Sequence, residues 1–525
     1  MTTRNRLSLL AIILFLFCLG SLVLLPVPFT RDQGIYAYNA WRWLDGGMFY
    51  RDSFGHKGPL LYLIYAAALK LSSGAMWGPN LADILARAAA IIFVYAAGRQ
   101  LLSGRAALLA ALFTALPLFG VFNSCWWNAQ AETFMLPLMA CSAWLVAWNR
   151  ERLRLPLILA AGLIAAQAVA IKPTAAAHAL FLFCWLLVPG PRETEGGRWK
   201  APAAFAAGGL IGISGWLVYL AARGALGPMW EFLIVFNSFH AESRVLGTEL
   251  WSLAQRGFWP IFNLLPVLAL FLLFRRQGEG RRAAAFTLGW FAASVLQIGL
   301  QFKFFLYHWL VLIPPMALAA GAGLDTISGA ASRWFGRWTG RAILAIVAAW
   351  FIFVFGRCWI LVEESYQTRE YLLHRITLAQ YYARFNAGDA FGKGDFNMLA
   401  SAAAADYVRK NTPPEARVLV FGYEPIVNVL SARPAPGRFE IDYPLTFTPP
   451  SARARRYRDQ WRAQFMADLH KTPPALVILL DNDINSLELK TSIEQAQEFT
   501  EFRKWLNLNY KEGAVIEDFH FYSKK

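Results

Sequence analysis

The 525-residue chain is 57% hydrophobic and only 16% charged, and long apolar windows recur through most of its length. A water-soluble protein has no core large enough to bury so many apolar residues. The composition therefore excludes a purely soluble protein and predicts an α-helical polytopic membrane protein. The net charge of +16 first suggests a nucleic-acid partner. The basic residues, however, cluster in short connectors between the apolar windows, so we expect no nucleic-acid partner and a phospholipid bilayer instead.

Eleven apolar windows have the ~17–25 residues that a membrane-spanning helix needs. The Lys and Arg residues of the connectors orient them with the N-terminus in the cytoplasm and the C-terminus outside. No small-residue cleavage site follows the first window, so we expect it to be retained rather than removed as a signal peptide. The windows are 7–27, 81–98, 105–122, 133–149, 155–171, 174–190, 202–222, 259–274, 283–301, 305–324 and 341–360.

The topology depends on the interpretation of residues 59–73. Counted as a further span, this segment would place every later basic connector outside, and it is short and contains Lys70. We therefore expect an interfacial or re-entrant helix. The outer connectors are then 28–80, 123–132, 172–174, 223–258 and 301–309.

Ionisable residues gather in these outer connectors. Charge beside the hydrocarbon is costly unless it is paired or faces a wet cavity, so the clustering predicts a site. The spans themselves contain few polar residues, and we expect no chain of buried acids inside the bundle. The residues are Asp32, Asp45, Asp52, His56, Lys57, Glu132, Lys172, Glu231, His240, Glu242, Lys303 and His308.

Four of these residues are candidates for a chemical role. Asp32 follows the first span, where interfacial acids are common, yet a carboxylate there can also act as a general base or bind a divalent cation. Lys57, in GHKGP, either extends to the headgroups or binds a lipid-linked phosphate. Its neighbour His56 can donate to that phosphate or ligate a metal. Glu132 begins a very apolar span, where packing does not explain an acid.

The other outer residues are expected to complete one cavity containing carboxylates and cations, which suits cleavage of a phosphate ester. Taken singly, most of them fit interface anchors, and Asp45 and Asp52 fit turns. The residues expected to line the cavity are Gln33, Tyr36, Lys172, Glu231 and His240, with Lys303, Tyr307 and His308 supplying its cationic side.

The composition changes to that of a soluble domain after about residue 361. A helix and turn over 401–416, strands at 417–423 and 474–483, a helix at 494–510 and a last strand at 519–522 predict a small α/β unit. No Gly-rich phosphate loop is visible, so we expect no nucleotide site. The expected domains are a membrane domain over 1–360, a connecting helical segment over 361–395 and a soluble α/β domain over 396–525.

Several motifs occur in the order typical of one enzyme family. An acid after the first span, an aromatic-rich outer loop and the HKGP turn before LLY resemble the GT-C membrane glycosyltransferases. The most similar groups are the aminoarabinose transferases that modify lipid A, the bacterial protein-mannosyltransferase-like family and the galacturonosyl transferases of the lipopolysaccharide core. GRQLLSGRAALLAALF, AETFMLPLMA, IKPTA and KFFLYHWLVLIPP extend the resemblance over roughly residues 5 to 325. The α/β tail is similar to the exported domain of many members.

The resemblance implies a GT-C fold and a sugar donor carried on polyprenyl phosphate. The acceptor would be a lipid, a glycan or a protein at the outer face of the bacterial inner membrane, with the C-terminal domain in the periplasm. Asp32 would be the general base and Glu132 a second acid that holds the acceptor or a metal. Lys57 would bind the donor phosphate, helped by His56, Lys303, Tyr307 or His308. A divalent cation (Mg, Mn or Zn) is the candidate cofactor, with Asp32, His56 and Glu132 as candidate ligands.

Three positions depart from the family pattern. Gln33 stands where many members have a second acid, His56 stands where lipid A-modifying members tend to have glutamate, and Gly58 stands where proline is common. Three other functions remain open from the residues: a transporter or flippase for lipid-linked saccharides, a polymerase or ligase with an oligosaccharide donor, and a non-catalytic membrane scaffold. Absent internal repeats disfavour the transporter. The gathering of ionisable residues on one face disfavours the scaffold.

Overall fold

The computed structural model describes residues 2–120, 128–149, 154–188, 199–242, 268–269, 272, 279–302, 304–350, 358–383, 385, 397–484 and 490–525. The chain divides into two compact units, each described here by itself. The first unit comprises Met1–Leu25, Asn80–Val218 and Val245–Tyr366. The second unit comprises Pro26–Pro79, Tyr219–Arg244 and Gln367–Lys525, so it joins the outer loops 28–80 and 223–244 to the C-terminal region.

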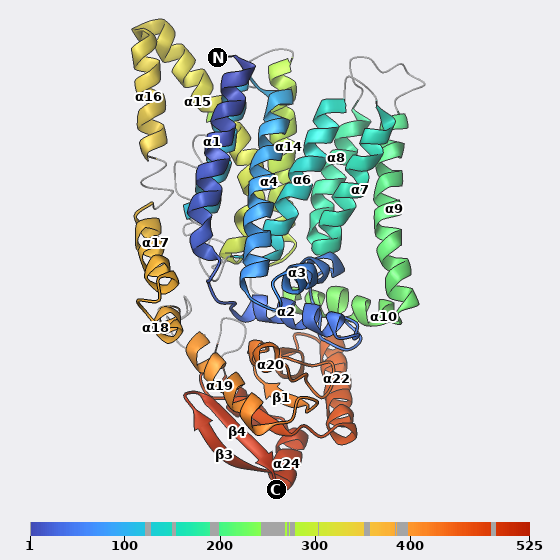
Figure 1. Ribbon diagram of the computed structural model, residues 1–525. Coiled ribbons are helices and arrows are strands. Elements are labelled where there is room, and N and C mark those ends of the chain that lie inside the picture. Colours follow the sequence, from blue (N-terminus) through green and yellow to red (C-terminus); the bar gives the residue numbers. More distant parts are fainter. Residues whose placement is uncertain are drawn as a thin grey trace. The chain divides into compact units, whose positions relative to one another are not determined.

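The first unit is built from helices (Figure 1). Five stretches of the described chain are long and apolar enough to cross a membrane: Thr3–Leu24, Trp77–Leu101, Ala131–Asn149, Lys200–Ala222 and Tyr307–Phe335. Each overlaps a predicted span, whereas Gly104–Phe119, Leu155–Ile171 and Pro173–Leu187 are apolar but shorter. The chain is thus a multi-pass membrane protein, and the count of eleven spans stays a prediction. The expected span 259–274 lies mostly outside the described residues.

Most helices of this unit overlap the apolar windows, but α17 overlaps only the end of the window 341–360 and continues into the second unit. They are α1 (Thr3–Ser21), η1 (Leu22–Leu24), α4 (Trp77–Leu101), α5 (Gly104–Gly120), α6 (Ala131–Asn149), α7 (Leu155–Ile171), η2 (Pro173–Ala175), α8 (Ala176–Leu187), α9 (Lys200–Ala222), α14 (Glu279–Gly299), η5 (Leu306–Leu312), α15 (Ile313–Phe335), α16 (Arg337–Trp350) and α17 (Cys358–Leu372).

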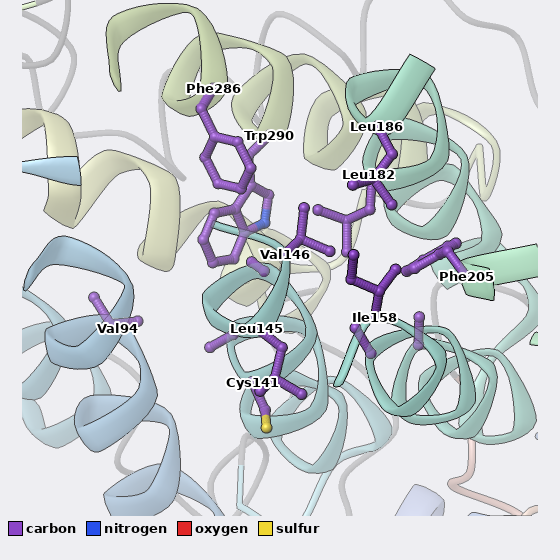
Figure 2. Packing of buried hydrophobic residues seen from close by; sticks show 14 of the residues in the cluster. Val94, Cys141, Leu145, Val146, Ile158, Leu182, Leu186, Phe205, Phe286 and Trp290 are labelled. Carbon is purple, nitrogen blue, oxygen red and sulfur yellow. The ribbon is translucent and has the colours of Figure 1, made fainter. Parts of the chain in front are cut away.

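The core of the first unit lies where α6, α7, α8 and α14 meet. Figure 2 shows Trp290 and Phe286 of α14 beside residues of α6 and α8, with Ile158 of α7 close to Phe205 of α9. Helices α7 and α9 approach closely because Gly162 and Gly208 lie at their contact, where a Cβ on either glycine would meet the backbone carbonyl of the facing helix. Small residues of this kind allow membrane helices to pack backbone against backbone.

One ion pair lies inside α4, although we expected few polar residues within the spans. Asp83 and Arg87, one turn apart, are joined at 2.8 Å, and both side chains are only 1% exposed. Arg87 also donates to the carbonyl of Leu118 at 2.7 Å and to Asn128 Oδ1 at 3.1 Å. These bonds attach α4 to the end of α5 and to the residues before α6, so the pair helps to hold the chain that leads into Glu132.

The second unit contains the outer-loop helices and a mixed sheet (Figure 1). The loop helices are α2 (Arg31–Leu44), α3 (Pro59–Leu71), α10 (Leu226–Met229), the π-helical η4 (Trp230–Phe236) and α11 (Asn237–Glu242). Helix α3 has 13 residues, which is about 20 Å and too short for a hydrocarbon core of ~30 Å. This length supports the expected interfacial helix at 59–73.

The C-terminal region forms the α/β domain that the sequence predicts. Its sheet has the order β1-β2-β4-β3, with β1 and β2 parallel and the other pairs antiparallel. Strands β1 and β2 fall within the predicted strands, and β4 begins with the predicted strand at 519 but continues to Lys524. Strand β3 and the long helix α22 were not predicted. The elements are α18 (Leu378–Ala383), α19 (Met398–Asn411), β1 (Val418–Phe421), α20 (Ile426–Ser431), α21 (Tyr443–Thr446), α22 (Ala452–Lys471), β2 (Leu476–Leu480), α23 (Ser492–Glu498), α24 (Thr500–Asn509), β3 (Tyr510–Ile516) and β4 (Phe519–Lys524).

Candidate active site

Asp32 lies in the first turn of α2, and its side chain is partly exposed. An acid is stabilised there by the partial positive charge of the helix N-terminus. Thr30 and Gln33 form a capping box, in which the Gln33 side chain accepts the Thr30 N–H at 3.2 Å. Gln33 thus fixes the start of the helix that carries Asp32.

One face of α2 is held by the C-terminal domain. Arg31, Gly34 and Tyr38 follow one another at helical spacing and share this face. Arg31 Nε lies 2.9 Å from Glu424 Oε1, with both side chains under a tenth exposed. A Cβ on Gly34 would lie 3.4 Å from Ile426, and the N–H of Ala435 donates to the Tyr38 hydroxyl at 2.9 Å. The first helix of the site is therefore anchored by the last domain of the chain.

Lys57 is held by its backbone, which leaves its ammonium available. Gly58 is the N-cap and Pro59 the first residue of α3, a favoured place for proline. The Lys57 N–H donates to the Tyr62 hydroxyl at 3.0 Å, and the Lys57 carbonyl accepts from the Tyr50 hydroxyl at 2.6 Å. The lysine is 7% exposed. Within the described chain, no hydrogen bond or ion pair joins its ammonium to another residue.

Tyr62 links Lys57 to Asp32. Burial raises the pKa of the Tyr62 hydroxyl, the Lys57 N–H that it accepts lowers it, and the charges of Glu440 and Asp32 raise it further. The hydroxyl is thus hydrogen-bonded to Lys57 while it lies within the field of the Asp32 carboxylate. Asp32 and Lys57, which the sequence separates by 25 positions, come to the same part of the second unit. We did not predict a role for Tyr62.

His56 and Tyr36 are also buried in the second unit. His56 stacks on Phe54, with ring centroids 5.9 Å apart, and its carbonyl accepts from the Asn237 side chain at 3.2 Å. Tyr36 is fully buried and meets Tyr65 edge-on at 5.5 Å. These contacts place both residues near the loop that carries Lys57, and their substrate roles stay predictions.

Glu231, expected to line the cavity, is bound to the C-terminal domain. Its oxygens lie 3.0 and 3.3 Å from the two terminal nitrogens of Arg438, and the Trp461 indole N–H also donates to it. Arg438 covers the Phe232 ring at 4.4 Å from its centroid. A bidentate arginine pair of this kind orients both partners. The observed contacts of Glu231 are therefore structural, and its role in a cavity stays a prediction.

Glu132, Lys172 and His308 come together in the first unit, and we call them the Glu132 cluster. The Lys172 ammonium pairs with Glu132 Oε1, and His308 Nε2 lies 3.8 Å from the same oxygen. Glu132 is fully buried, Lys172 is 8% exposed and His308 is 1% exposed. Tyr307 meets His308 edge-on at 4.6 Å.

The second oxygen of Glu132 has no hydrogen-bond partner within the described chain. A buried carboxylate is costly unless it is paired, and here the pairing involves one oxygen. In this cluster, Glu132 Oε1 is paired with the Lys172 ammonium, whereas Oε2 has no hydrogen-bond donor within the described chain. This atom can accept a hydroxyl or amine proton, or a hydrogen bond from an acceptor substrate.

Several predicted residues have no described contact with the other site residues. Lys303 lies outside the described residues, and for His240 the structure describes only its place in α11. Asp45 pairs with Arg42 at 2.7 Å at the end of α2. Asp52 pairs with Arg51 at 2.7 Å and accepts the Met48 N–H. These local contacts are those of turn residues, as expected for the two aspartates.

Among the buried acids of the C-terminal domain that were not predicted, Glu424 and Glu440 contact the first outer loop. Burial raises the pKa of Glu424 to about 7, against the lowering effect of Arg31. Burial likewise raises the pKa of Glu440 to about 8, although hydrogen bonds from Phe54 and Asn39 lower it. Glu424 stands alone among apolar and aromatic residues in FGYEPIV, and such isolation of an acid was the signal that would have found it. Glu440, in RFEIDY, lies two residues from both Arg438 and Asp442 and has no such signal.

Metal binding stays a prediction. Within the described ranges, no group of three or more His, Cys, Asp or Glu side chains is placed to hold an ion. Of the candidate ligands, Asp32 and His56 belong to the second unit and Glu132 to the first.

Comparisons with known proteins agree with this architecture. Residues 56–220 match the family model of dolichyl-phosphate-mannose-protein mannosyltransferase. ArnT from Cupriavidus metallidurans bound to undecaprenyl phosphate is similar over 100% of this chain and 98% of its own, with a TM-score of 0.62 and 15% identity. The archaeal oligosaccharyltransferase AglB from Archaeoglobus fulgidus, in complex with an inhibitory peptide and a dolichol-phosphate, covers 99% of this chain and 74% of its own, with a TM-score of 0.53 and 12% identity.

A comparison with curated protein sequences gave no match. The family model and the two solved structures nevertheless confirm the resemblance to the GT-C membrane glycosyltransferases that use polyprenyl-phosphate carriers. They also confirm that this chain has an ArnT-like fold, with helices followed by a small C-terminal sheet.

Proposed function

We propose that this chain, whose fold is that of the GT-C membrane glycosyltransferases, transfers a sugar from a polyprenyl-phosphate carrier to a lipid, glycan or protein acceptor. Transfer would take place at the outer face of the bacterial inner membrane. The observation that carries the proposal is the environment of Lys57, a buried lysine whose ammonium has no partner within the described chain. Its backbone N–H donates to the Tyr62 hydroxyl, which lies within the field of the Asp32 carboxylate.

A cation in this position suits the phosphate of a lipid-linked donor. Leaving a buried ammonium without a partner is costly, and an anionic ligand removes that cost. As the glycosidic bond breaks, negative charge develops on the polyprenyl phosphate, and Lys57 would stabilise it. ArnT, which shares the fold, has been solved with undecaprenyl phosphate. This supports a carrier of that chemical kind.

Asp32 would act as the general base. It would take the proton from the acceptor hydroxyl or amine as the acceptor attacks the anomeric carbon, and the bond to the phosphate oxygen would break with inversion. Glu132, with its unused oxygen, would bind the acceptor. The residues place no limit on the sugar, so hexosyl and pentosyl donors are equal candidates.

Release of polyprenyl phosphate tests the proposal. The purified protein is incubated with a panel of polyprenyl-phosphate monosaccharides and candidate acceptors, and free polyprenyl phosphate and the glycosylated product are quantified together. Asp32→Asn should lower turnover by about 10²–10⁴-fold, the usual contribution of a general base, and remain folded. Wild-type turnover by that variant would remove Asp32 from the mechanism.

The same assay separates the alternatives that the sequence left open. A polymerase or ligase would use an oligosaccharide donor, and AglB is an oligosaccharyltransferase of similar fold, so an oligosaccharide donor belongs in the panel. A flippase would move the intact donor across a vesicle membrane without releasing polyprenyl phosphate. A scaffold would do neither.

A further inference from the structure

One irregular segment of the C-terminal domain, residues 433–442, contacts both outer loops of the second unit. Its Ala435 N–H donates to Tyr38 of α2, and its Arg438 binds Glu231 of η4. Glu440 makes the third contact. The segment is also hydrogen-bonded to its own domain, for example through the Val418 N–H, which donates to the Pro434 carbonyl at 3.0 Å. It therefore connects the domain to the two loops.

Glu440 bridges two parts of the first outer loop. Its Oε1 accepts from the Asn39 amide of α2 at 3.0 Å, and its Oε2 accepts the backbone N–H of Phe54 at 2.6 Å. Glu440 and Asn39 are fully buried and Phe54 is 1% exposed. One carboxyl group therefore joins α2 to the strand-like stretch that leads into His56 and Lys57.

Further hydrogen bonds close this connection into a network. The Asn39 amide also donates to the Phe54 carbonyl at 3.2 Å, and the Ser53 hydroxyl donates to Asn39 Oδ1 at 2.7 Å. Buried polar networks that are well satisfied fix a single local arrangement. Phe54 is also held by Phe232 and Phe236, with ring centroids at 4.6 and 5.0 Å.

The two ends of the bridge lead directly to the proposed catalytic pair. Asp32 precedes Asn39 by seven residues, which is two turns of helix and the same side of α2. Lys57 follows Phe54 by three residues. Through Asn39 and Phe54, Glu440 therefore links the helix that carries Asp32 to the loop that carries Lys57.

We infer that Glu440 is a positioning residue for the proposed sugar transfer: it accepts one hydrogen bond from the Asp32 helix and one from the Lys57 loop, and so holds base and cation in register. This inference rests on the proposed function. It gives the C-terminal domain a definite task, since the domain supplies the carboxyl group that accepts hydrogen bonds from both Asn39 and Phe54. Burying a carboxyl group has a cost, which this bridge offsets.

Kinetics of two variants test the inference. Glu440→Gln keeps the shape but has one acceptor oxygen, so it can serve only one of the two donors, and Glu440→Ala serves neither. We expect kcat to fall about 10- to 100-fold for Glu440→Ala, the usual effect of a small misplacement of reacting groups, and by an intermediate amount for Glu440→Gln. The KM for the donor should change by less than about threefold, because the Lys57 ammonium is still present.

Amide exchange supplies a readout that does not depend on catalysis. The Phe54 N–H is bonded to Glu440, so hydrogen–deuterium exchange of the peptide that contains Phe54 should become faster in Glu440→Ala, which has no acceptor there. Glu498→Gln is the matched control, because Glu498 pairs with Lys490 on an exposed surface of the same domain. It should leave kcat and the exchange at Phe54 unchanged.

A double-mutant cycle with Asn39→Ala adds a second test. Since Asn39 and Glu440 act through one bridge, the double variant should lose little more kcat than Glu440→Ala alone. Additive losses would overturn the inference, and so would wild-type kcat in Glu440→Ala, whatever its exchange rate. If instead the wild-type protein transfers no sugar from any donor, the proposed function fails. Unchanged exchange at Phe54 would then still show, separately, that the bridge is absent.

Discussion

The guanidinium Nε of Arg31 lies 2.9 Å from Oε1 of Glu424, although 392 residues separate the two in the chain. Arg31 is the neighbour of Asp32, and Glu424 follows the first strand of the C-terminal domain. Both side chains are buried. The domain that ends the chain therefore fixes the turn of helix that carries the proposed base.

Truncating the Glu424 side chain to alanine should destabilise the protein more than replacing its carboxylate by the uncharged amide of glutamine. Glu424→Ala removes the carboxylate that faces the buried Arg31 guanidinium, and removing one member of a buried ion pair typically costs about 3–5 kcal/mol. Glu424→Gln keeps an oxygen that can accept from Arg31 and should cost less. The midpoint of thermal unfolding in detergent measures both. Glu498→Gln, at an exposed pair worth about 0–1 kcal/mol, is the control. Equal midpoints for Glu424→Ala and the control would show that the buried pair contributes nothing.

Acidification should stabilise the second unit through its buried acids. The pKa of Glu424 is raised to about 7 and that of Glu440 to about 8, from an ordinary value of 4.5. A raised pKa means that the folded state binds the proton more tightly than the unfolded state. The resulting stability is complete below about pH 4.5 and is lost as pH rises through about 7 for Glu424 and about 8 for Glu440.

Unfolding midpoints measured between pH 5 and 9 test this sign. The wild-type midpoint should fall across the interval, and Glu440→Gln should flatten the part of the curve near pH 8. Glu498→Gln should reproduce the wild-type curve. A wild-type midpoint that rises toward pH 9 while Glu440→Gln stays flat would contradict the predicted sign.

Lys57→Met should weaken donor binding more than any other change to the first outer loop. Methionine retains most of the volume of lysine but has no charge. Hydrogen bonds to charged groups are worth about 1.5–3 kcal/mol, so the Kd for polyprenyl phosphate should rise about 10- to 100-fold. Binding can be measured by quenching of tryptophan fluorescence. Lys70→Met, at the exposed end of α3, is the control. If Lys57→Met bound polyprenyl phosphate with the same Kd as the wild-type protein, Lys57 would not be part of the phosphate site.

Much of the fold and part of the site could be predicted from the sequence, for physical reasons. Apolar windows report membrane helices directly, because hydrocarbon selects against charge over about 20 residues. The gathering of Glu132 and Lys172 follows from the same cost, since each ion lowers the burial cost of the other. Contacts such as Arg31–Glu424 and Asn39–Glu440 connect positions far apart in the chain. No local pattern specifies such contacts.

The missed strand β3 shows a second limit. Tyr510–Ile516 has small, charged and branched residues in turn, and only one of its seven residues is buried. Such a sequence has no periodic apolar face. It becomes a strand because it pairs with β4 in a hairpin, which is a tertiary cause.

The Glu132 cluster permits one more test, because its members are few and buried. Glu132→Gln or Lys172→Met alone removes one partner of a buried pair and should lower the unfolding midpoint strongly, by about 3–5 kcal/mol in free energy. The double variant contains no uncompensated charge, so it should recover most of that stability. If Glu132 binds the acceptor, the recovered double variant should still have little transferase activity and a raised KM for the acceptor. Recovery of activity together with stability would show that Glu132 serves the fold alone.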